Sequence, residues 1–289
     1  MAFNVAAFKT RALSAMFFVI IMLCGLLWNQ WSFLALFTII HFGCWFEYNR
    51  LMDKIDPRFL QVPKILRYLV MIFGYALMLW MTDPIAYPVG NWMSLKQFGG
   101  YLLMSTGLLA LIAMVYYRKQ LYLDTLLSIV AGILYISLSW ALMLKLRGRV
   151  SARFQGDTGW ILPVILIASI WINDTMAYMI GSLVGKRPLS TISPKKTWEG
   201  TIGGVILAVL IVSYGGAAIW DLPFRALVLL SLIATVIGTL GDLLESKLKR
   251  MAGVKDSGQM MPGHGGFLDR FDSLLLATPY VWIIADLFL

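Results

Sequence analysis

Charged residues are scarce in this sequence. They make up 13% of its 289 residues, whereas about a quarter of the residues in a soluble globular domain are charged. Hydrophobic residues make up 60% of the chain and are gathered in long blocks. This composition argues against an ordinary soluble domain and indicates an integral membrane protein.

Cysteine and histidine are also rare. Cys24 and Cys44 lie inside apolar blocks, so neither a disulfide framework nor a thiolate metal site is expected. The two histidines, His41 and His264, are too few for a histidine-rich metal site. The Walker A, Rossmann and GxSxG motifs are missing as well, so any phosphate-binding site must use another scaffold.

The apolar blocks predict an all-α polytopic membrane protein with about nine transmembrane helices. We expect one continuous membrane domain, in which residues 1–150 form a scaffold and residues 151–289 carry the catalytic motifs. Several blocks are shorter than the ~20 residues that a span needs, so eight or ten spans stay open. The first block resembles a signal peptide, but no small-residue cleavage site follows it, which favours a retained span. The blocks are 13–28, 31–46, 65–81, 101–117, 123–144, 160–184, 202–220, 226–243 and 274–289.

The net charge of +9 comes from 24 basic and 15 acidic side chains. In a membrane protein, an excess of positive charge usually reflects basic loops that set the orientation and contact anionic lipid headgroups. This explanation is preferred to nucleic-acid binding. Most of the basic loops alternate along the chain, which predicts a cytoplasmic N-terminus and a C-terminus outside. The basic loop that begins at Lys145 falls on the opposite side and disagrees with this orientation.

Asp174 lies within an apolar block, in "WINDTMAYMIGSLVGK". A carboxylate at that depth is costly unless it faces a polar cavity, a cation or a partner. It is therefore either a functional acid or a helix-packing acid paired with a lysine or hydroxyl. Asn173 and Tyr178 share or adjoin its helix face, and the spacing of Gly181 and Gly185 indicates close helix packing.

The next polar stretch is "STISPKKTWEGTIGG", residues 190–204. Ser193 and Pro194 predict a helix start there. Lys195 and Lys196 would then occupy the first turn, where the helix dipole disfavours a cation. The two lysines either set membrane orientation or bind a phosphate at that helix end, and the residues alone leave both readings open.

The third polar stretch, residues 241–273, reads "GDLLESKLKRMAGVKDSGQMMPGHGGFLDRFDS". Asp242 closes one apolar block, and Asp269 and Asp272 open the next on one helix face. Acids at a helix start complement its dipole, but three aspartates at one bilayer face also suit Mg²⁺, which takes one or two carboxylates plus substrate phosphates. Glycines around His264 allow positive φ and close approach to a ligand. Positive charge comes from Lys247, Lys249, Arg250, Lys255 and Arg270.

These stretches together resemble a known family. The run Ser246-x-x-Lys249-Arg250-x4-Lys255-Asp256-x-Gly258-x3-Pro262-x-His264-Gly265-Gly266-x2-Asp269-Arg270-x-Asp272 is similar to the signature of phosphatidate cytidylyltransferases, the bacterial CDP-diacylglycerol synthases. "NDTMAYMIGSLVGK" and "SPKKTWEG" resemble the two other hallmark segments of that family, in the expected order. No position that defines the signature departs from it, whereas residues 1–150 match only as a set of spans.

The resemblance implies that CTP and phosphatidate give CDP-diacylglycerol and pyrophosphate, with Mg²⁺ and with room for a second metal ion. The lipid phosphate has a second pKa of ~6 and is already anionic, so metal ions and lysines, which neutralise charge, are needed more than a base. We expect the metal ligands to be Asp242, Asp269 and Asp272, with Asp174 as a further member. The expected catalytic set is Asp242, Asp269, Asp272, Lys195 and Lys255. The expected phosphate-binding set is Ser193, Lys195, Lys196, Lys249, Arg250, Lys255, His264, Gly265, Gly266 and Arg270.

The resemblance also implies a bacterial cytoplasmic (inner) membrane location with the site on the cytoplasmic side. The expected partners are CTP, phosphatidate and membrane lipids, without nucleic acid, and a homodimer stays open. One alternative is a CTP-dependent lipid kinase, which would need a base near the phosphates and would release CDP in place of pyrophosphate. Another is an ion or phosphate transporter, which predicts polar residues in several spans. The first five apolar blocks here contain almost no ionisable residues.

Overall fold

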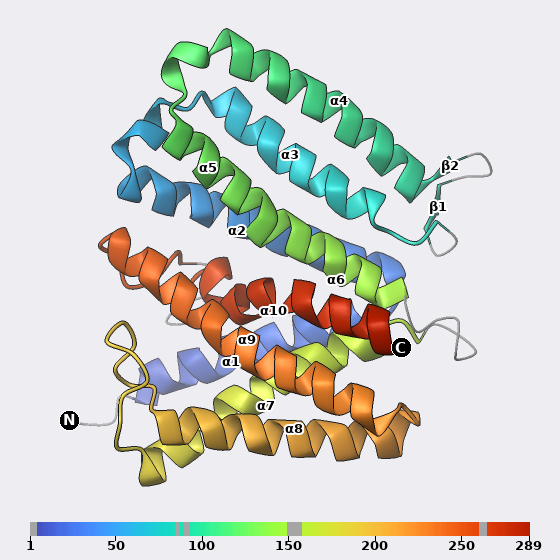
Figure 1. Ribbon diagram of the computed structural model, residues 1–289, viewed down its shortest axis with the longest axis vertical. Coiled ribbons are helices and arrows are strands. Elements are labelled where there is room, and N and C mark those ends of the chain that lie inside the picture. The colour runs from blue at the N-terminus through green and yellow to red at the C-terminus, as the bar shows by residue number, and fades with distance from the viewer. Residues whose placement is uncertain (1–4, 85–86, 90–92, 149–157, 260–264) are drawn as a thin grey trace. The chain divides into compact units, whose positions relative to one another are not determined.

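The computed structural model describes residues 5–84, 87–89, 93–148, 158–259 and 265–289. This part of the chain is almost entirely helical (Figure 1). The rest consists of connecting loops, short 3₁₀ turns and one antiparallel pair of two-residue strands, β1 (Pro88–Val89) and β2 (Met93–Ser94). The predicted all-α class is therefore confirmed.

Each of the nine apolar blocks coincides with a helical segment. A π-helical turn over Ile133–Ser137 joins α5 and α6 into one run from Leu123 to Gly148. The helices are α1 (Val5–Leu27), α2 (Gln30–Ile55), α3 (Lys64–Trp80), α4 (Leu95–Tyr116), α5 (Leu123–Gly132), α6 (Leu138–Gly148), α7 (Ile161–Val184), α8 (Trp198–Trp220), α9 (Phe224–Met251) and α10 (Phe267–Phe288).

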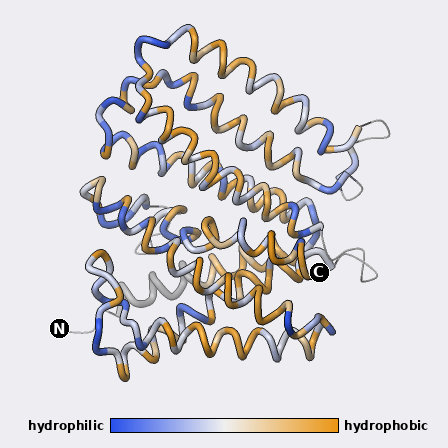
Figure 2. The backbone as a smooth tube through the Cα atoms, viewed as in Figure 1, coloured by the Kyte–Doolittle hydropathy of each residue, from blue (hydrophilic) through white to orange (hydrophobic). Residues whose placement is uncertain are grey.

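Six helices of the described chain are long and apolar enough to cross a membrane: α4, the α5–α6 run, α7, α8, α9 and α10. Figure 2 shows hydrophobic residues along most of their length and hydrophilic residues at their ends and in the loops. The chain is thus a helical membrane protein by length and composition. The count of nine spans and the orientation of the N-terminus stay predictions.

The chain divides into two compact units. The N-terminal unit contains residues 1–137 and 251–271, and the C-terminal unit contains residues 138–250 and 272–289. Most of the glycine-rich signature therefore belongs with the N-terminal helices, although it lies in the C-terminal half of the sequence. The predicted division of roles at residue 150 stays a prediction.

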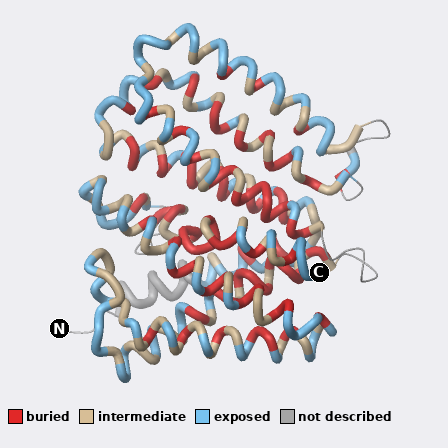
Figure 3. Tube along the Cα trace, viewed as in Figure 1, coloured by how far each residue is buried: buried red, intermediate tan, exposed pale blue. Residues whose placement is uncertain are grey.

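In the N-terminal unit, α3 and α4 pack along one another as a hairpin (Figure 1). The core contains fully buried aromatic side chains of α2, such as Phe33, Phe37 and Trp45. Figure 3 shows much of α4 as exposed. Its exposed apolar residues include Met104, Leu111 and Val115. Such an exposed apolar surface suits a lipid environment, because helices that span a bilayer keep their polar backbone groups internal and present apolar side chains to lipid.

In the C-terminal unit, α7 and α8 form a second hairpin (Figure 1). A Cβ atom at Gly200 would lie 2.6 Å from the carbonyl oxygen of Ala177, and one at Gly204 would lie 2.8 Å from that of Asn173. Small residues allow such close approach of helix backbones. A Cβ at Gly181 would likewise meet the Thr197 hydroxyl at 3.0 Å, in line with the packing role predicted from its spacing. The hairpin fixes the polar end of α7 against the start of α8.

Helix α8 begins at Trp198, with Thr197 as its N-cap. The Thr197 hydroxyl accepts a hydrogen bond from the Gly200 backbone N–H at 3.2 Å, which is the usual contact of an N-cap threonine. The predicted helix start at Ser193 and Pro194 is therefore wrong, because the capping side chain lies later in the chain. The two lysines between them lie in the loop before α8 and not in its first turn.

Candidate active site

The C-terminal unit contains a cavity of about 470 Å³. Its walls come from α7, the loop between α7 and α8, the first turn of α8, and α9. Ionisable, amide and hydroxyl side chains face it, although the unit around them is largely apolar. The lining residues are Asn173, Asp174, Ala177, Tyr178, Gly181, Ser182, Ser193, Lys195, Lys196, Thr197, Thr201, Thr239 and Asp242.

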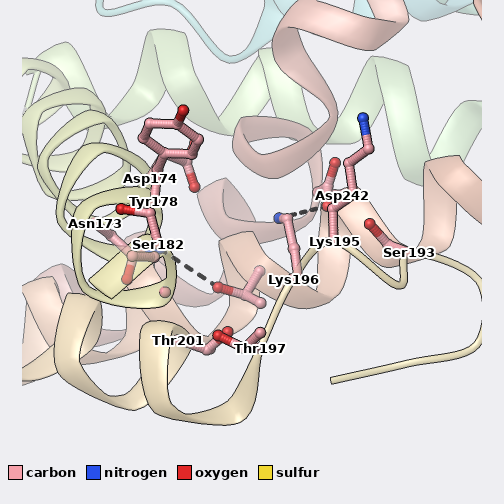
Figure 4. Close-up of a pocket in the computed structure, with 13 residues that line it drawn as sticks. Asn173, Asp174, Tyr178, Ser182, Ser193, Lys195, Lys196, Thr197, Thr201 and Asp242 are labelled. Atoms are coloured by element: carbon pink, nitrogen blue, oxygen red, sulfur yellow. Dashed lines mark hydrogen bonds and ion pairs between the residues drawn. The ribbon is translucent and has the colours of Figure 1, made fainter. Parts of the chain in front are cut away.

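Lys196 is the central charge of this cavity. Its Nζ atom lies 2.5 Å from Oδ2 of Asp242, and Figure 4 shows the lysine side chain between Asp174 and Asp242. Burial disfavours the charged ammonium, but the charge of Asp242, followed by those of Asp174 and Asp272, outweighs burial and raises the pKa of Lys196. Lys196 is therefore a cation throughout the physiological pH range.

Three aspartates from three helices surround that ammonium. Asp174 comes from α7, Asp242 from α9 and Asp272 from α10. The carboxyl groups of Asp242 and Asp272 contact one another, and Asp272 is buried with only 8% of its surface exposed. Helices α9 and α10 can approach this closely because a Cβ atom at Gly241 would lie 2.6 Å from the Asp272 carbonyl oxygen.

The donor chemistry of this cluster fits a hard divalent cation. Within the described ranges, no three carboxylate, imidazole or thiolate side chains form a ready metal-binding group. Mg²⁺, however, usually binds protein through only one or two carboxylates and takes its other ligands from substrate phosphates and water. Asp242 and Asp272 are two contacting carboxylates of this kind, so the residues fit the ion when a phosphorylated substrate is present.

Asp269, also predicted as a metal ligand, has a different environment. It belongs to the N-terminal unit, where its Oδ2 atom accepts hydrogen bonds from the Ser257 N–H and hydroxyl, both at 2.8 Å, and from the Gly266 N–H at 2.7 Å. An acid three residues into a helix that accepts from the N-cap N–H is half of a capping box. The structure thus gives Asp269 the helix-capping role that the sequence left open.

The predicted phosphate-binding residues fall into several groups. Ser193, Lys195 and Lys196 line the cavity of the C-terminal unit, and Figure 4 shows Lys195 extending away from the ion pair that Lys196 makes. Lys249 is paired with the fully buried Glu245 at 2.6 Å, so its charge is already compensated. Arg250 is exposed at the end of α9.

The remaining members of that group lie in residues 255–272, called the signature segment from here on. Lys255 lines another cavity, of about 610 Å³, within the N-terminal unit. Gly265 adopts a φ of +81°, the left-handed region that glycine enters most readily. Gly266 precedes α10, and Arg270 lies in its first turns. His264 lies outside the described residues.

Sequence reasoning missed residues of α2. Arg50 and Lys54 line the same cavity as Lys255, and the buried carboxylate of Glu47 contacts the signature segment. The available signal was a lone acid at the end of the apolar block 31–46. That signal identified no partner, because the contacting residues are more than 200 positions away in the chain.

Comparison with known proteins identifies the family of this chain. The model of the Cytidylyltransferase family matches residues 9–288. A phosphatidate cytidylyltransferase of Haemophilus influenzae is 31% identical over 303 residues, covering 94% of this chain and 96% of that protein. One of Staphylococcus saprophyticus is 31% identical and covers 96% of this chain and 98% of that protein. One of Bacillus subtilis is 46% identical over 121 residues, which cover 41% of this chain and 45% of that protein. The chain belongs to the cytidylyltransferase family.

Proposed function

We propose that this protein transfers the cytidylyl group of CTP to phosphatidate and releases pyrophosphate, which yields CDP-diacylglycerol for phospholipid synthesis. The observation that carries the proposal is the Lys196 ammonium, held 2.5 Å from Asp242 in a polar cavity within a membrane-spanning unit. The relatives that match nearly the whole chain are named for this reaction. The protein is thus a nucleotidyltransferase.

In this reaction an oxygen of the lipid phosphate attacks the α-phosphorus of CTP. The bond from that phosphorus to the oxygen bridging the α- and β-phosphates breaks, and pyrophosphate leaves with the electron pair. Because the lipid phosphate is already ionised at neutral pH, no side chain has to remove a proton. The main barrier is repulsion between two anions, so a fixed cation at the reacting phosphates contributes most.

Lys196 supplies that cation. Its partner in the structure is Asp242, and a substrate phosphate would take the place of this carboxylate beside the ammonium. Asp242 would then be free, next to Asp272, to hold Mg²⁺. The ion would supply further neutralisation of charge on the phosphates and on the departing pyrophosphate.

The membrane location belongs to the same proposal. Exposed apolar residues on α4 and α8, such as Leu108 and Ile206, support contact with lipid tails. The alternation of basic loops supports a cytoplasmic N-terminus, nine spans, a site on the cytoplasmic side and a bacterial inner-membrane location. The homodimer stays a prediction.

The test is release of labelled pyrophosphate from CTP by the purified protein with phosphatidate and Mg²⁺. We expect pyrophosphate and CDP-diacylglycerol in equal amounts. A kinase would instead release CDP and a phosphorylated lipid. No pyrophosphate above background with any divalent cation would refute the proposal.

A further inference from the structure

Glu47 of α2 is a buried carboxylate that binds the signature segment. Only 6% of its surface is exposed. Its Oε2 atom accepts hydrogen bonds from the Ser257 hydroxyl at 2.7 Å and from the Leu268 N–H at 2.9 Å, and its Oε1 atom accepts one from the Phe267 N–H at 2.9 Å. All four residues belong to the N-terminal unit, and both oxygens of Glu47 are in use.

These contacts take the place of an N-cap side chain. Helix α10 starts at Phe267, and the first N–H groups of a helix have no acceptor within it. The preceding residue, Gly266, has no side chain that could accept them. Glu47 takes the N–H groups of the first two helical residues, and its negative charge also suits the positive end of the helix dipole.

Ser257 connects Glu47 to the local capping acid. Its hydroxyl lies 2.7 Å from Oε2 of Glu47 and 2.8 Å from Oδ2 of Asp269. Its backbone N–H also donates to Asp269. Glu47 and Asp269 thereby fix both Ser257 and the first turn of α10.

The glycines of the segment are required by this arrangement. Cβ atoms at Gly258 and at Gly266 would both overlap the Glu47 carboxylate, and one at Gly43 would overlap the Phe267 ring. Gly43 lies one turn before Glu47 on the same face of α2. Two glycines of the signature therefore make room for a carboxylate from the other half of the sequence.

The fixed loop lines a cavity of this unit that contains three basic side chains and two acidic ones, Asp53 and Asp256. Lys255, two residues before Ser257, shares that cavity of about 610 Å³ with Arg50 and Lys54, which follow Glu47 on α2. Positive charges from two separate segments can serve one phosphate group only when both segments are held in place. Glu47 is the residue that ties them together.

We propose that Glu47 is a positioning residue for the reaction. It holds the signature segment so that Lys255 shares one phosphate-binding cavity with Arg50 and Lys54. The inference rests on the proposed function, because the phosphate is that of CTP or of phosphatidate. The two sources are distinguished by measuring KM for each substrate separately.

The test compares Glu47→Gln, Glu47→Asp and Ser257→Ala in purified full-length protein. Glutamine keeps the size of the side chain but presents an amide NH₂ to at least one of the donors that the carboxylate accepts. We expect KM for one phosphorylated substrate to rise about tenfold or more in Glu47→Gln, with a smaller fall in kcat. Glu47→Asp keeps two acceptor oxygens and should recover part of the loss, and Ser257→Ala should raise KM of the same substrate by less.

Ser137→Ala is the matched control. The Ser137 hydroxyl is buried in the same unit and accepts a hydrogen bond from Nε1 of Trp45 at 2.9 Å, far from the signature segment in the chain. We expect this variant to lose thermal stability but to keep the wild-type KM for both substrates. Equal KM changes in Ser137→Ala and Glu47→Gln would mean that Glu47 acts only through general stability, and would overturn the inference.

Hydrogen exchange gives a readout independent of turnover. The amides of Phe267 and Leu268 should exchange faster in Glu47→Gln than in the wild type, while those of α3 and α4 stay unchanged. Unchanged exchange at the start of α10, or an unchanged KM in Ser257→Ala, would also overturn the inference. An inactive wild-type protein would instead refute the proposed function and leave the exchange result as the test of Glu47.

Discussion

The protein contains two groups of acidic side chains that differ in what they contact. In the C-terminal unit, Asp242 faces an ammonium group, and the cavity around it is open to small ligands. In the N-terminal unit, Glu47 and Asp269 accept their hydrogen bonds from backbone N–H groups and from Ser257. The first group can exchange its partner for a metal ion or a phosphate, whereas the hydrogen bonds of the second hold the chain.

This difference distinguishes two roles, helix capping and contact with the reacting site, for acids of the same signature motif. Asp269 and Asp272 are three residues apart in one helix, and both are acids of the same motif. One caps the helix, and the other contacts Asp242 beside Lys196. Which acid is available for chemistry is therefore decided by the donors around it and not by its place in the motif.

The largest expected effect is that of Asp242→Asn. The substitution removes the charge that pairs with Lys196 and one of the two carboxylates that would hold Mg²⁺, so we expect the rate of pyrophosphate release to fall by about a hundredfold or more. Expression and helix content should be retained, because Asp242 is partly exposed. Turnover close to wild type would contradict the assignment of the C-terminal cavity as the reacting site.

Lys196→Gln should have the next largest effect, and a larger one than Lys195→Gln. Both lysines line the cavity, but only Lys196 is paired with Asp242 at 2.5 Å. We expect a fall of about tenfold to a hundredfold in kcat/KM for Lys196→Gln and a smaller one for Lys195→Gln. Equal effects would show that the two lysines contribute only through their general charge.

The pH dependence of Lys196 follows from its raised pKa. A group whose pKa is raised in the folded state stabilises it fully below the unfolded value, here 10.5, and loses that contribution only as pH rises through the folded value. The difference in Tm between wild type and Lys196→Gln should therefore stay constant from pH 7 to pH 9.5. A difference that disappears over this range would mean that the lysine is not stabilised by the aspartates.

Asp269→Asn should have a moderate effect of another kind. An amide can still accept from one donor, so we expect a loss of about 1–2 kcal/mol in stability, as for a helix cap, and a reduced rate. The dependence of the rate on Mg²⁺ should not change. Measuring Tm and the Mg²⁺ titration on the same preparation checks both statements.

Much of this arrangement could be predicted from the sequence. The nine apolar blocks gave the helices, because long hydrophobic runs indicate buried or membrane helices. Asp242 and Asp272 stood out because they are acids that border apolar blocks. Lys196 stood out only because it was expected in the first turn of a helix, whereas the structure places it in the loop before α8. The prediction of their roles depended on the family signature.

What could not be predicted depends on long-range contacts. Periodicity relates residues within one helix, so it identified no partner for Glu47, whose contacts come from residues 257–268. The start of α8 was predicted too early from Ser193 and Pro194. That pattern is local, and it cannot reveal the isolated antiparallel β-bridge between Pro188 and Thr197 that precedes the helix. The hydrogen bonds of Asp269 to Ser257 and Gly266 could not be foreseen either, because they depend on the fold of the loop before α10.

The smallest expected effect in this series is that of Gly215→Ala, which serves as the comparison for Gly258→Ala. Gly258→Ala places a Cβ atom against the Glu47 carboxylate, whereas a Cβ atom at Gly215 in α8 would meet nothing within 4 Å. We expect Gly258→Ala to lower the free energy of unfolding and Gly215→Ala to raise it slightly, by up to about 1 kcal/mol. Both changes are followed by the shift in Tm. The same sign for both variants would contradict the close contact between Glu47 and the segment.

The most direct test of the central claim is a Mg²⁺ titration of pyrophosphate release for wild type, Asp242→Asn and Asp269→Asn. We predict that Asp269→Asn reaches half of its maximal rate at the wild-type Mg²⁺ concentration, while Asp242→Asn needs at least about tenfold more or shows no turnover. A shift in Asp269→Asn with none in Asp242→Asn would contradict the account, because it would place the metal with the acid that the structure gives to the helix cap.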